Sequence, residues 1–162
     1  MMIEALHAVT REAKWPILAQ SILAELSPQH DFTESFSTYW IEAGHVIRGQ
    51  IADDCVLVRL LRHLLSPYQG GAITLFRGEN LERLDAGKLG LCWSSNIDVA
   101  RMFGRGLNSF PGGGVLLRAH FEPQAIICGP NNHSQYLGED QYTIDPFNVI
   151  NKTIVEQYPP AD

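Results

Sequence analysis

Apolar residues in the first part of the chain recur every three or four positions, which is the spacing of an amphipathic helix. The pattern predicts one helix over residues 3–13 and a second over 16–26. It predicts a third over 31–51 and a fourth over 56–65, which Pro67 ends. We expect these helices to pack on one face of a sheet, because each has only one apolar side to bury.

From residue 72 the pattern changes to short apolar runs separated by glycine, proline and asparagine, which is typical of strands and turns. The predicted strands lie at 72–76, 91–95, 115–121, 125–128 and 141–145, and one helix is predicted over 96–106. Helices followed by strands favour an α+β fold over an alternating α/β fold. We expect a single domain over 1–162, with a helical half at 1–70, a sheet-rich half at 71–157 and a frayed tail at 158–162.

Length and charge restrict the class of protein. The chain has 162 residues, enough for one core and too few for two ordinary domains. Its 12 Lys and Arg against 18 Asp and Glu leave a net charge of -6, so we expect no broad nucleic-acid surface. No apolar run has membrane-spanning length, and the N-terminus lacks the apolar core of a signal peptide. We therefore expect a soluble, cytoplasmic protein that a secretion system needing no cleavable signal could still deliver to another cell.

The three cysteines are Cys55, Cys92 and Cys128. Their odd number, wide spacing and aliphatic neighbours predict reduced core thiols rather than disulfides or a zinc site. No metal is expected, since His133 has no Cys or His partner at ligand spacing.

Three short segments carry the candidate chemistry. Arg77 ends an apolar strand and precedes Gly78, whose missing side chain would let a ligand approach the backbone. Ser94-Ser95 ends the next strand and precedes a helix. Glu139-Asp140-Gln141 begins the last predicted strand, where the first and third side chains point to the same face.

Each segment also has a purely structural interpretation. Arg77 could be a surface arginine that closes its strand and pairs with Glu79 or Glu82. Ser95 or Asn96 could simply cap the following helix. The glycine-dense stretch from 105 to 114 could be the approach to a hairpin, and it lacks the phosphate-loop and dinucleotide glycine patterns.

The order of these segments resembles the Arg, Ser-Thr-Ser, Glu-x-Glu layout of ADP-ribosyltransferases, which split NAD⁺ and move ADP-ribose to an acceptor. The resemblance covers residues 72 to 149 and implies helices packed on a mixed, mainly antiparallel split β-sheet. It also implies an acceptor, which the acidic chain suggests is a protein. The NAD⁺-binding residues that it implies are Arg77, Gly78, Ser94, Ser95, Arg105 and Phe110. The acceptor loop that it implies contains His133, Gln135 and Tyr136.

The catalytic set implied by the resemblance is Ser94, Glu139 and Gln141, which we expect to converge with Arg77 on one pocket sized for a dinucleotide. Glu139 would assist acceptor activation. Gln141 stands where the family usually has its catalytic glutamate, and glutamine lacks the negative charge that stabilises an oxocarbenium-like transition state.

Three explanations of Gln141 compete. Divergence could have left a binding protein, a shifted register could make Glu139 the working acid, or a deliberate Glu-to-Gln change could keep substrate intact. We favour the third, because glutamine is isosteric with glutamate; a glutamine codon in the native gene would exclude it. Two other functions stay open: NAD⁺ hydrolysis without an acceptor, and a catalytically silent interaction or immunity domain.

Overall fold

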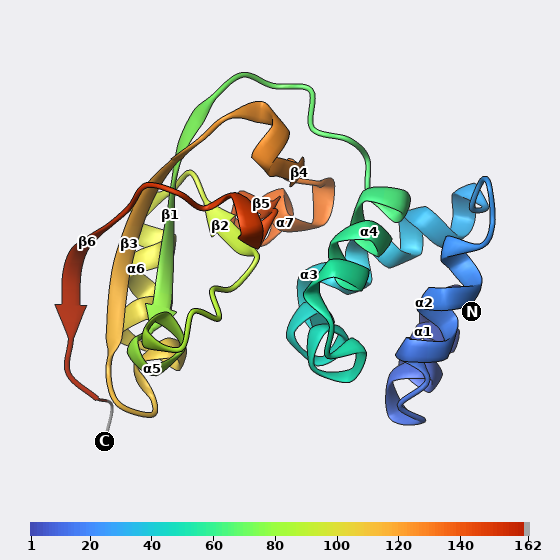
Figure 1. Cartoon of the computed structure of the whole chain (residues 1–162), viewed down its shortest axis with the longest axis horizontal. Helices are drawn as coiled ribbons and strands as arrows, with labels where there is room; N and C mark the ends of the chain where they lie inside the picture. Colours follow the sequence, from blue (N-terminus) through green and yellow to red (C-terminus); the bar gives the residue numbers. More distant parts are fainter. Residues whose placement is uncertain (161–162) are drawn as a thin grey trace. The chain divides into compact units, whose positions relative to one another are not determined.

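Two compact units make up the chain in this computed structural model, which describes residues 1–160 (Figure 1). The helical unit comprises Met1–Pro67, and the sheet unit begins at Tyr68. The expected boundary at residue 70 therefore lies three residues too late. Helices followed by strands confirm the α+β class.

The four predicted helices of the helical unit are all present. They are α1 (Met2–Arg11), α2 (Trp15–Leu23), α3 (His30–Ile51) and α4 (Asp54–Leu64). Pro16 lies in the first turn of α2, where its missing N–H costs no hydrogen bond. Asp53 caps α4 by accepting from the backbone N–H groups of Cys55 and Val56.

A polar contact joins three of these helices inside an aromatic core. The Thr10 hydroxyl lies 2.6 Å from the Tyr39 hydroxyl and accepts from the Trp15 indole at 2.9 Å. Trp15 also packs edge-on against Phe36, with ring centroids 5.8 Å apart. Because the buried hydroxyl and indole have partners, the aromatic rings can be buried without orphaned polar groups.

The sheet unit is built on one six-stranded sheet in the order β4-β5-β2-β1-β3-β6. Every strand pair among the described residues is antiparallel, so the expected mixed sheet was wrong. The strands are β1 (Ile73–Asn80), β2 (Cys92–Ser94), β3 (Gly114–Phe121), β4 (Ile126–Cys128), β5 (Gln141–Ile144) and β6 (Lys152–Tyr158).

Three elements of the sheet unit were not predicted. Strand β6 pairs with β3 as far as Tyr158, which opposes Gly114, so Tyr158 does not belong to a frayed tail. The rest of that expected tail includes 161–162, which lie outside the described residues. The short helices α5 (Leu81–Asp85) and α7 (Asn132–Tyr136) replace what we expected to be connections.

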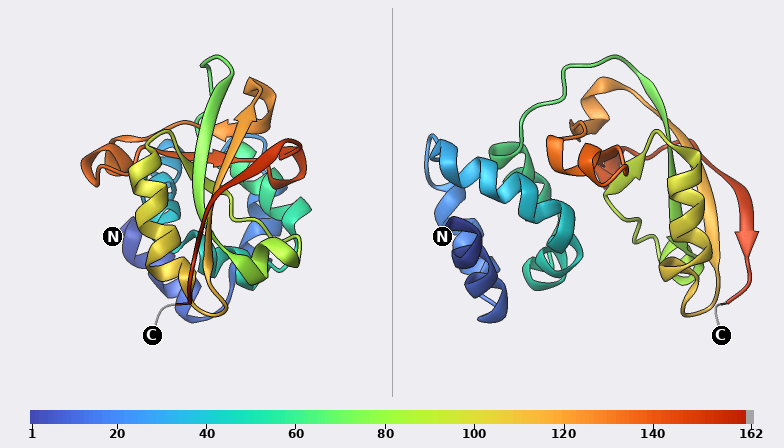
Figure 2. Two further views of the ribbon diagram at one scale, coloured as in Figure 1. Left: turned by 90° about the vertical axis from the view of Figure 1, so that its left-hand side faces the viewer. Right: turned by 180° about the vertical axis from the view of Figure 1, so that it is seen from behind.

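Helix α6 (Ile97–Arg105) lies along one face of the sheet, over β1 and β3 (yellow in Figure 2). Glycines make this close approach possible. A Cβ at Gly78 would come closer than 3.0 Å to the backbone of Ala100 and Gly104, a separation that real Cβ atoms essentially never show. The helix backbone therefore rests directly on the strand backbone.

The opposite face of the sheet carries the apolar core of the unit. Trp93 packs edge-on against Phe121, with ring centroids 5.1 Å apart, and the Trp93 indole donates to the Gly90 carbonyl. The other buried core residues are Leu75, Leu89, Val115, Leu117, Ala119, Ala125, Ile126 and Ile144. The expectation of core thiols was wrong for Cys55, which is exposed; Cys92 and Cys128 are half-buried, and within residues 1–160 no disulfide joins any of the three.

Candidate functional site

Three strands that carry the sequence motifs lie next to one another, although β3 and β4 separate them in the chain. Phe76 of β1 opposes Ser94 of β2, and Ser94 opposes Gln141 of β5. These three residues therefore form one row across the sheet. Since opposed residues share a face, the side chains of Ser94 and Gln141 lie on the same side.

Hydrogen bonds fix this row in place. The buried Ser94 hydroxyl donates to the Glu139 carbonyl at 2.7 Å and accepts from the Asn96 N–H at 3.0 Å. The Gln141 side-chain amide donates to the Cys92 sulfur at 3.1 Å. Ser94 thus connects the end of β2 to the segment before β5 and to the start of α6.

Arg77 does not join Ser94 and Gln141 on their face. It follows Phe76, which shares a face with Ser94, so strand alternation directs the Arg77 side chain to the other face. The three side chains that were expected to converge on one pocket therefore do not share one face of the sheet. Ser94 and Gln141 are brought together, and Arg77 reaches them only through the backbone of Cys92.

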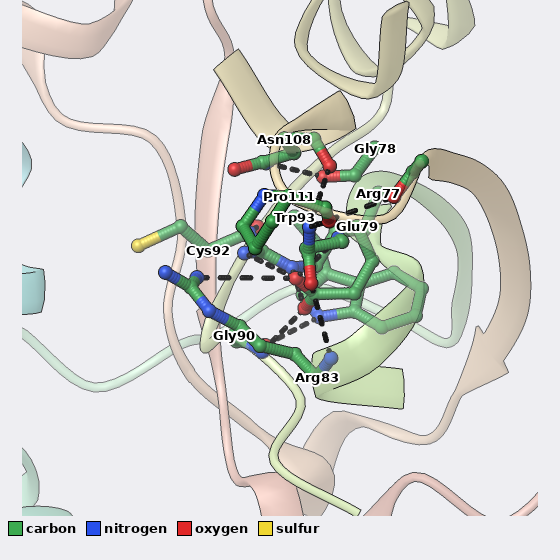
Figure 3. Close-up of polar contacts among 11 residues, drawn as sticks. Arg77, Gly78, Glu79, Arg83, Gly90, Cys92, Trp93, Asn108 and Pro111 are labelled. Atoms are coloured by element: carbon green, nitrogen blue, oxygen red, sulfur yellow. Dashed lines mark hydrogen bonds and ion pairs between the residues drawn. The ribbon is translucent and has the colours of Figure 1, made fainter. Parts of the chain in front are cut away.

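The Arg77 guanidinium is held by a buried carboxylate (Figure 3). Its Nε donates to Glu79 Oε2 at 2.6 Å and its Nη2 to Glu79 Oε1 at 3.5 Å. Its Nη1 donates to the Cys92 carbonyl at 2.7 Å. The side chain of Glu79 has 0% of its surface exposed and that of Arg77 has 13%, so this is a buried ion pair. Of the structural alternative, the pairing with Glu79 is confirmed, whereas the expected surface position at the end of the strand was wrong, because Arg77 is largely buried and β1 continues to Asn80.

Glu79 is ionised despite its burial because several donors surround it. Burial by itself would raise its pKa, but the charge and hydrogen bonds of Arg77 hold the pKa of Glu79 below its ordinary value. Backbone N–H groups of Gly90 and Asn80 donate to the same carboxylate at 2.8 and 2.9 Å. A carboxylate with this many donors stays negative at neutral pH.

Side chains replace the backbone ladder where β1 and β2 separate. The two strands share only the pair Phe76 and Ser94, and a continued ladder would oppose Gly78 to Cys92. Instead, Arg77 donates to the Cys92 carbonyl, and the Asn108 amide donates to the Gly78 carbonyl at 2.6 Å. Neither carbonyl is orphaned, so the strands can diverge at this level.

Gly78 was expected to leave room for a ligand, and this expectation was wrong. The space beside it is filled by the backbone of α6 at Ala100 and Gly104. The missing side chain serves the packing of a helix on a strand rather than the approach of a ligand.

Glu139 lies before β5 rather than on it, so the prediction that it shares a strand face with Gln141 was wrong. Asp140 between them has φ +44°, a left-handed conformation that breaks strand alternation. The Glu139 N–H donates to the Ser134 carbonyl at 3.0 Å, while its own carbonyl accepts from Ser94. Burial raises the pKa of Glu139, and the nearby charge of His133 partly opposes that effect.

The predicted acceptor residues lie on the short helix α7 rather than in an irregular loop. Asn131 caps this helix by accepting from the Ser134 N–H at 2.8 Å. Tyr136 is 86% exposed and Gln135 is exposed, whereas His133 is half-buried near Glu139. The segment before β5 thus presents one aromatic ring to solvent.

Ser95 is exposed and directly follows the last residue of β2. Asn96 is the cap of α6, since its side chain accepts from the Asp98 N–H at 3.0 Å. Of the two capping alternatives, Asn96 is therefore the one observed. The Asn96 backbone N–H also donates to the Ser94 hydroxyl.

Arg105 and Phe110 lie at the far end of α6 from Ser94. Arg105 ends that helix, about 12 Å along its axis from the first residue, and its guanidinium lies over the Tyr158 ring, 5.5 Å from the centroid. Phe110 is 71% exposed. A wide depression of about 680 Å³ opens on this flank and is lined by Asp98, Arg101, Met102, Arg105, Gly106 and Glu156. The side chains of Arg105 and Phe110 therefore do not lie beside the row of Ser94 and Gln141.

The glycine-dense stretch is fastened rather than open. The buried Asn80 amide donates to the Pro111 carbonyl at 2.6 Å and to the Asn108 carbonyl at 3.2 Å. The Gly113 N–H donates to the Ser109 carbonyl at 2.9 Å. These bonds give the connection between α6 and β3 a defined path. Because β3 pairs with β1 and β6 rather than with a strand that adjoins it in the chain, the stretch is not the approach to a hairpin.

Sequence reasoning missed the roles of Cys92, Asn80 and Asn108. Asn80 could have been found, because an asparagine directly after a strand and before a short polar segment is a capping signal. Nothing in the sequence marks Cys92 or Asn108, since their contacts depend on where β2 and the 107–109 turn lie in space.

Among residues 1–160, no helix is both long and apolar enough to cross a membrane. In the same range no group of three or more His, Cys, Asp and Glu side chains is arranged to hold a metal ion. Comparison of the chain with protein-family models, with curated proteins and with solved structures finds no match.

Proposed function

We propose that the sheet unit binds NAD⁺ as an ADP-ribosyltransferase-like domain and transfers ADP-ribose to an acceptor, a protein in the first instance. The observation that carries this proposal is the row of Phe76, Ser94 and Gln141 across three adjacent strands. The segments that suggested the resemblance are far apart in the chain, yet the sheet order β5-β2-β1 makes their strands neighbours. Strands β1 and β2 pair only at Phe76 and Ser94, which also fits a split sheet.

In the proposed reaction the bond between the nicotinamide nitrogen and the ribose breaks. Nicotinamide leaves with the bonding electrons, and the acceptor attacks the positively charged ribose carbon and loses a proton. Gln141 can hydrogen-bond a ribose hydroxyl but cannot offset the positive charge. Loss of one such electrostatic partner typically lowers the rate about a hundredfold or more. The chain with Gln141 should therefore bind NAD⁺ and turn it over slowly.

The test compares the chain with Gln141 with its Gln141→Glu variant. Calorimetry measures NAD⁺ binding, and release of labelled nicotinamide measures bond cleavage. Gln157→Glu is the matched control, because it adds the same charge at an exposed position of β6, at the opposite edge of the sheet from β4 and β5. We expect both 141 forms to bind NAD⁺ and only Gln141→Glu to cleave it about a hundredfold faster. Free ADP-ribose in the absence of any acceptor would indicate hydrolysis instead of transfer.

A second candidate is a catalytically silent interaction domain. Two observations favour it: the catalytic position carries an uncharged amide, and α6 fills the space at Gly78. Absence of NAD⁺ binding by both the chain with Gln141 and Gln141→Glu would refute the transferase proposal and leave this second candidate.

A further inference from the structure

Glu79 is the most enclosed acidic side chain near the candidate site, and no motif accounts for it. Its carboxylate has no exposed surface and accepts from Arg77, Asn80 and Gly90. Arg83 lies farther off, with Nη1 3.9 Å from Glu79 Oε1. An enclosed carboxylate that is held by several donors fixes the orientation of a flexible side chain that is its partner.

That partner is the Arg77 guanidinium. An arginine has five N–H donors in a rigid plane, so fixing two of its nitrogens fixes the direction of the rest. Glu79 holds Nε and Nη2, and the Cys92 carbonyl holds Nη1. Two further N–H groups of Arg77 have no partner within residues 1–160.

The position of Arg77 also bears on Ser94. Through the Cys92 carbonyl, Arg77 fixes the first residue of β2, and β2 carries Ser94 two residues later. Cys92 in turn accepts from the Gln141 amide through its sulfur. A shift of the guanidinium would therefore move the backbone on which the row of Ser94 and Gln141 is built.

We infer that Glu79 is a positioning residue, which orients Arg77 so that its two remaining N–H groups meet an anionic group of the dinucleotide while Cys92 and Ser94 stay in place. This inference rests on the proposed function, since it assigns the part of the site that would receive NAD⁺ phosphate or ribose oxygens. A guanidinium fork suits such oxygens better than a single ammonium group would.

The experiment measures NAD⁺ affinity by calorimetry at a temperature where circular dichroism shows each variant folded. Glu79→Gln keeps the shape of the side chain and removes its charge, and Glu79→Asp keeps the charge. Arg83→Gln is the matched control, because it removes a nearby charge without touching Arg77. We expect Glu79→Gln to weaken NAD⁺ binding about tenfold or more, Glu79→Asp to weaken it less, and Arg83→Gln to leave it unchanged.

Comparing the loss of NAD⁺ affinity in single and double variants distinguishes a positioning role of Glu79 from general stabilisation. If Glu79 acts through Arg77, then Glu79→Gln should add little further loss of NAD⁺ affinity in an Arg77→Lys background. A folded Glu79→Gln chain with the same NAD⁺ affinity as the unsubstituted chain would overturn the inference and leave the proposed function intact. Should Glu79→Gln not fold, Glu79→Asp decides, because unchanged affinity there would overturn the inference as well. If the chain with Gln141 and Gln141→Glu both fail to bind NAD⁺, the proposed function fails and the inference falls with it.

Discussion

Gly78 gives the sharpest test of how the sheet unit is built, because two interpretations of the same glycine predict different results. If a ligand approaches Gly78, alanine there should weaken ligand binding and leave stability unchanged. If α6 rests on Gly78, alanine should destabilise the sheet unit whether or not a ligand is present. The structure favours the second outcome, since backbone atoms of Ala100 and Gly104 already occupy the space.

The size of the effect follows from the contact. A Cβ at Gly78 would overlap the helix backbone so deeply that α6 must move by roughly one ångström, which backbone atoms cannot do by rotating a side chain. Overpacking of this kind costs about 1–3 kcal/mol, and we expect the upper end, near 3 kcal/mol. Alanine recovers only about 0.5–1 kcal/mol by restricting the unfolded chain. The net loss should be about 2 kcal/mol.

For a unit of this size, 2 kcal/mol corresponds to a fall of roughly 10 °C in the melting temperature. Thermal unfolding followed by circular dichroism measures that fall, and hydrogen exchange with mass spectrometry should show lost protection in α6 and β1. Gly71→Ala is the control, because a Cβ at Gly71 meets nothing within 4 Å. A Gly78→Ala chain as stable as Gly71→Ala would refute the packing argument.

Three further predictions concern charge and backbone entropy. Hydrogen bonds from Arg101 and Tyr158 lower the pKa of Glu156 to about 2. Carbon NMR should therefore find the Glu156 carboxyl titrating at about pH 2, and Arg101→Gln should move its pKa back toward 4.5. The stability due to this contact is present above pH 4.5 and is lost as pH falls through about 2, so Glu156→Gln should flatten the acid limb of a stability profile. Burial raises the pKa of Glu139 above 4.5, so just above that pH the native state binds more protons than the unfolded state. The free energy of unfolding should therefore fall as pH rises through this window. Urea titrations of Glu139→Gln should no longer show this fall. Gly49→Ala, at an open and exposed position within α3, should stabilise the helical unit by about 0.5–1 kcal/mol in the same titrations.

Periodicity was sufficient for most elements because apolar spacing is a local property. All four helices of the helical unit and five of the six strands lie where that spacing placed them. Strand β6 was missed although Thr153, Ile154 and Val155 are β-branched, since both of its faces are largely exposed and it lacks an alternating pattern. Helix α7 was missed because five polar and aromatic residues carry no apolar period.

The candidate site was predicted less well because its geometry depends on tertiary contacts. The sequence named Arg77, Ser94 and Gln141, and the sheet does place their strands side by side. It could not reveal that Asp140 has a left-handed backbone, which removes Glu139 from the strand face. Nor could it reveal that α6 lies against Gly78, because that contact depends on a helix packing across a strand.

The role of the ion pair between Arg77 and Glu79 becomes clear by comparison with a sheet in which the ladder between β1 and β2 continues. A continued ladder between β1 and β2 would satisfy the Cys92 and Gly78 carbonyls with backbone N–H groups and would bury no charge. A buried ion pair carries a desolvation penalty that often offsets its attraction, so stability alone gives little reason to prefer it. What the pair permits is divergence of two strands with both carbonyls still bonded, one by Arg77 and one by Asn108. The divergence starts one residue from the row of Ser94 and Gln141, which is where a ligand would need the sheet to part.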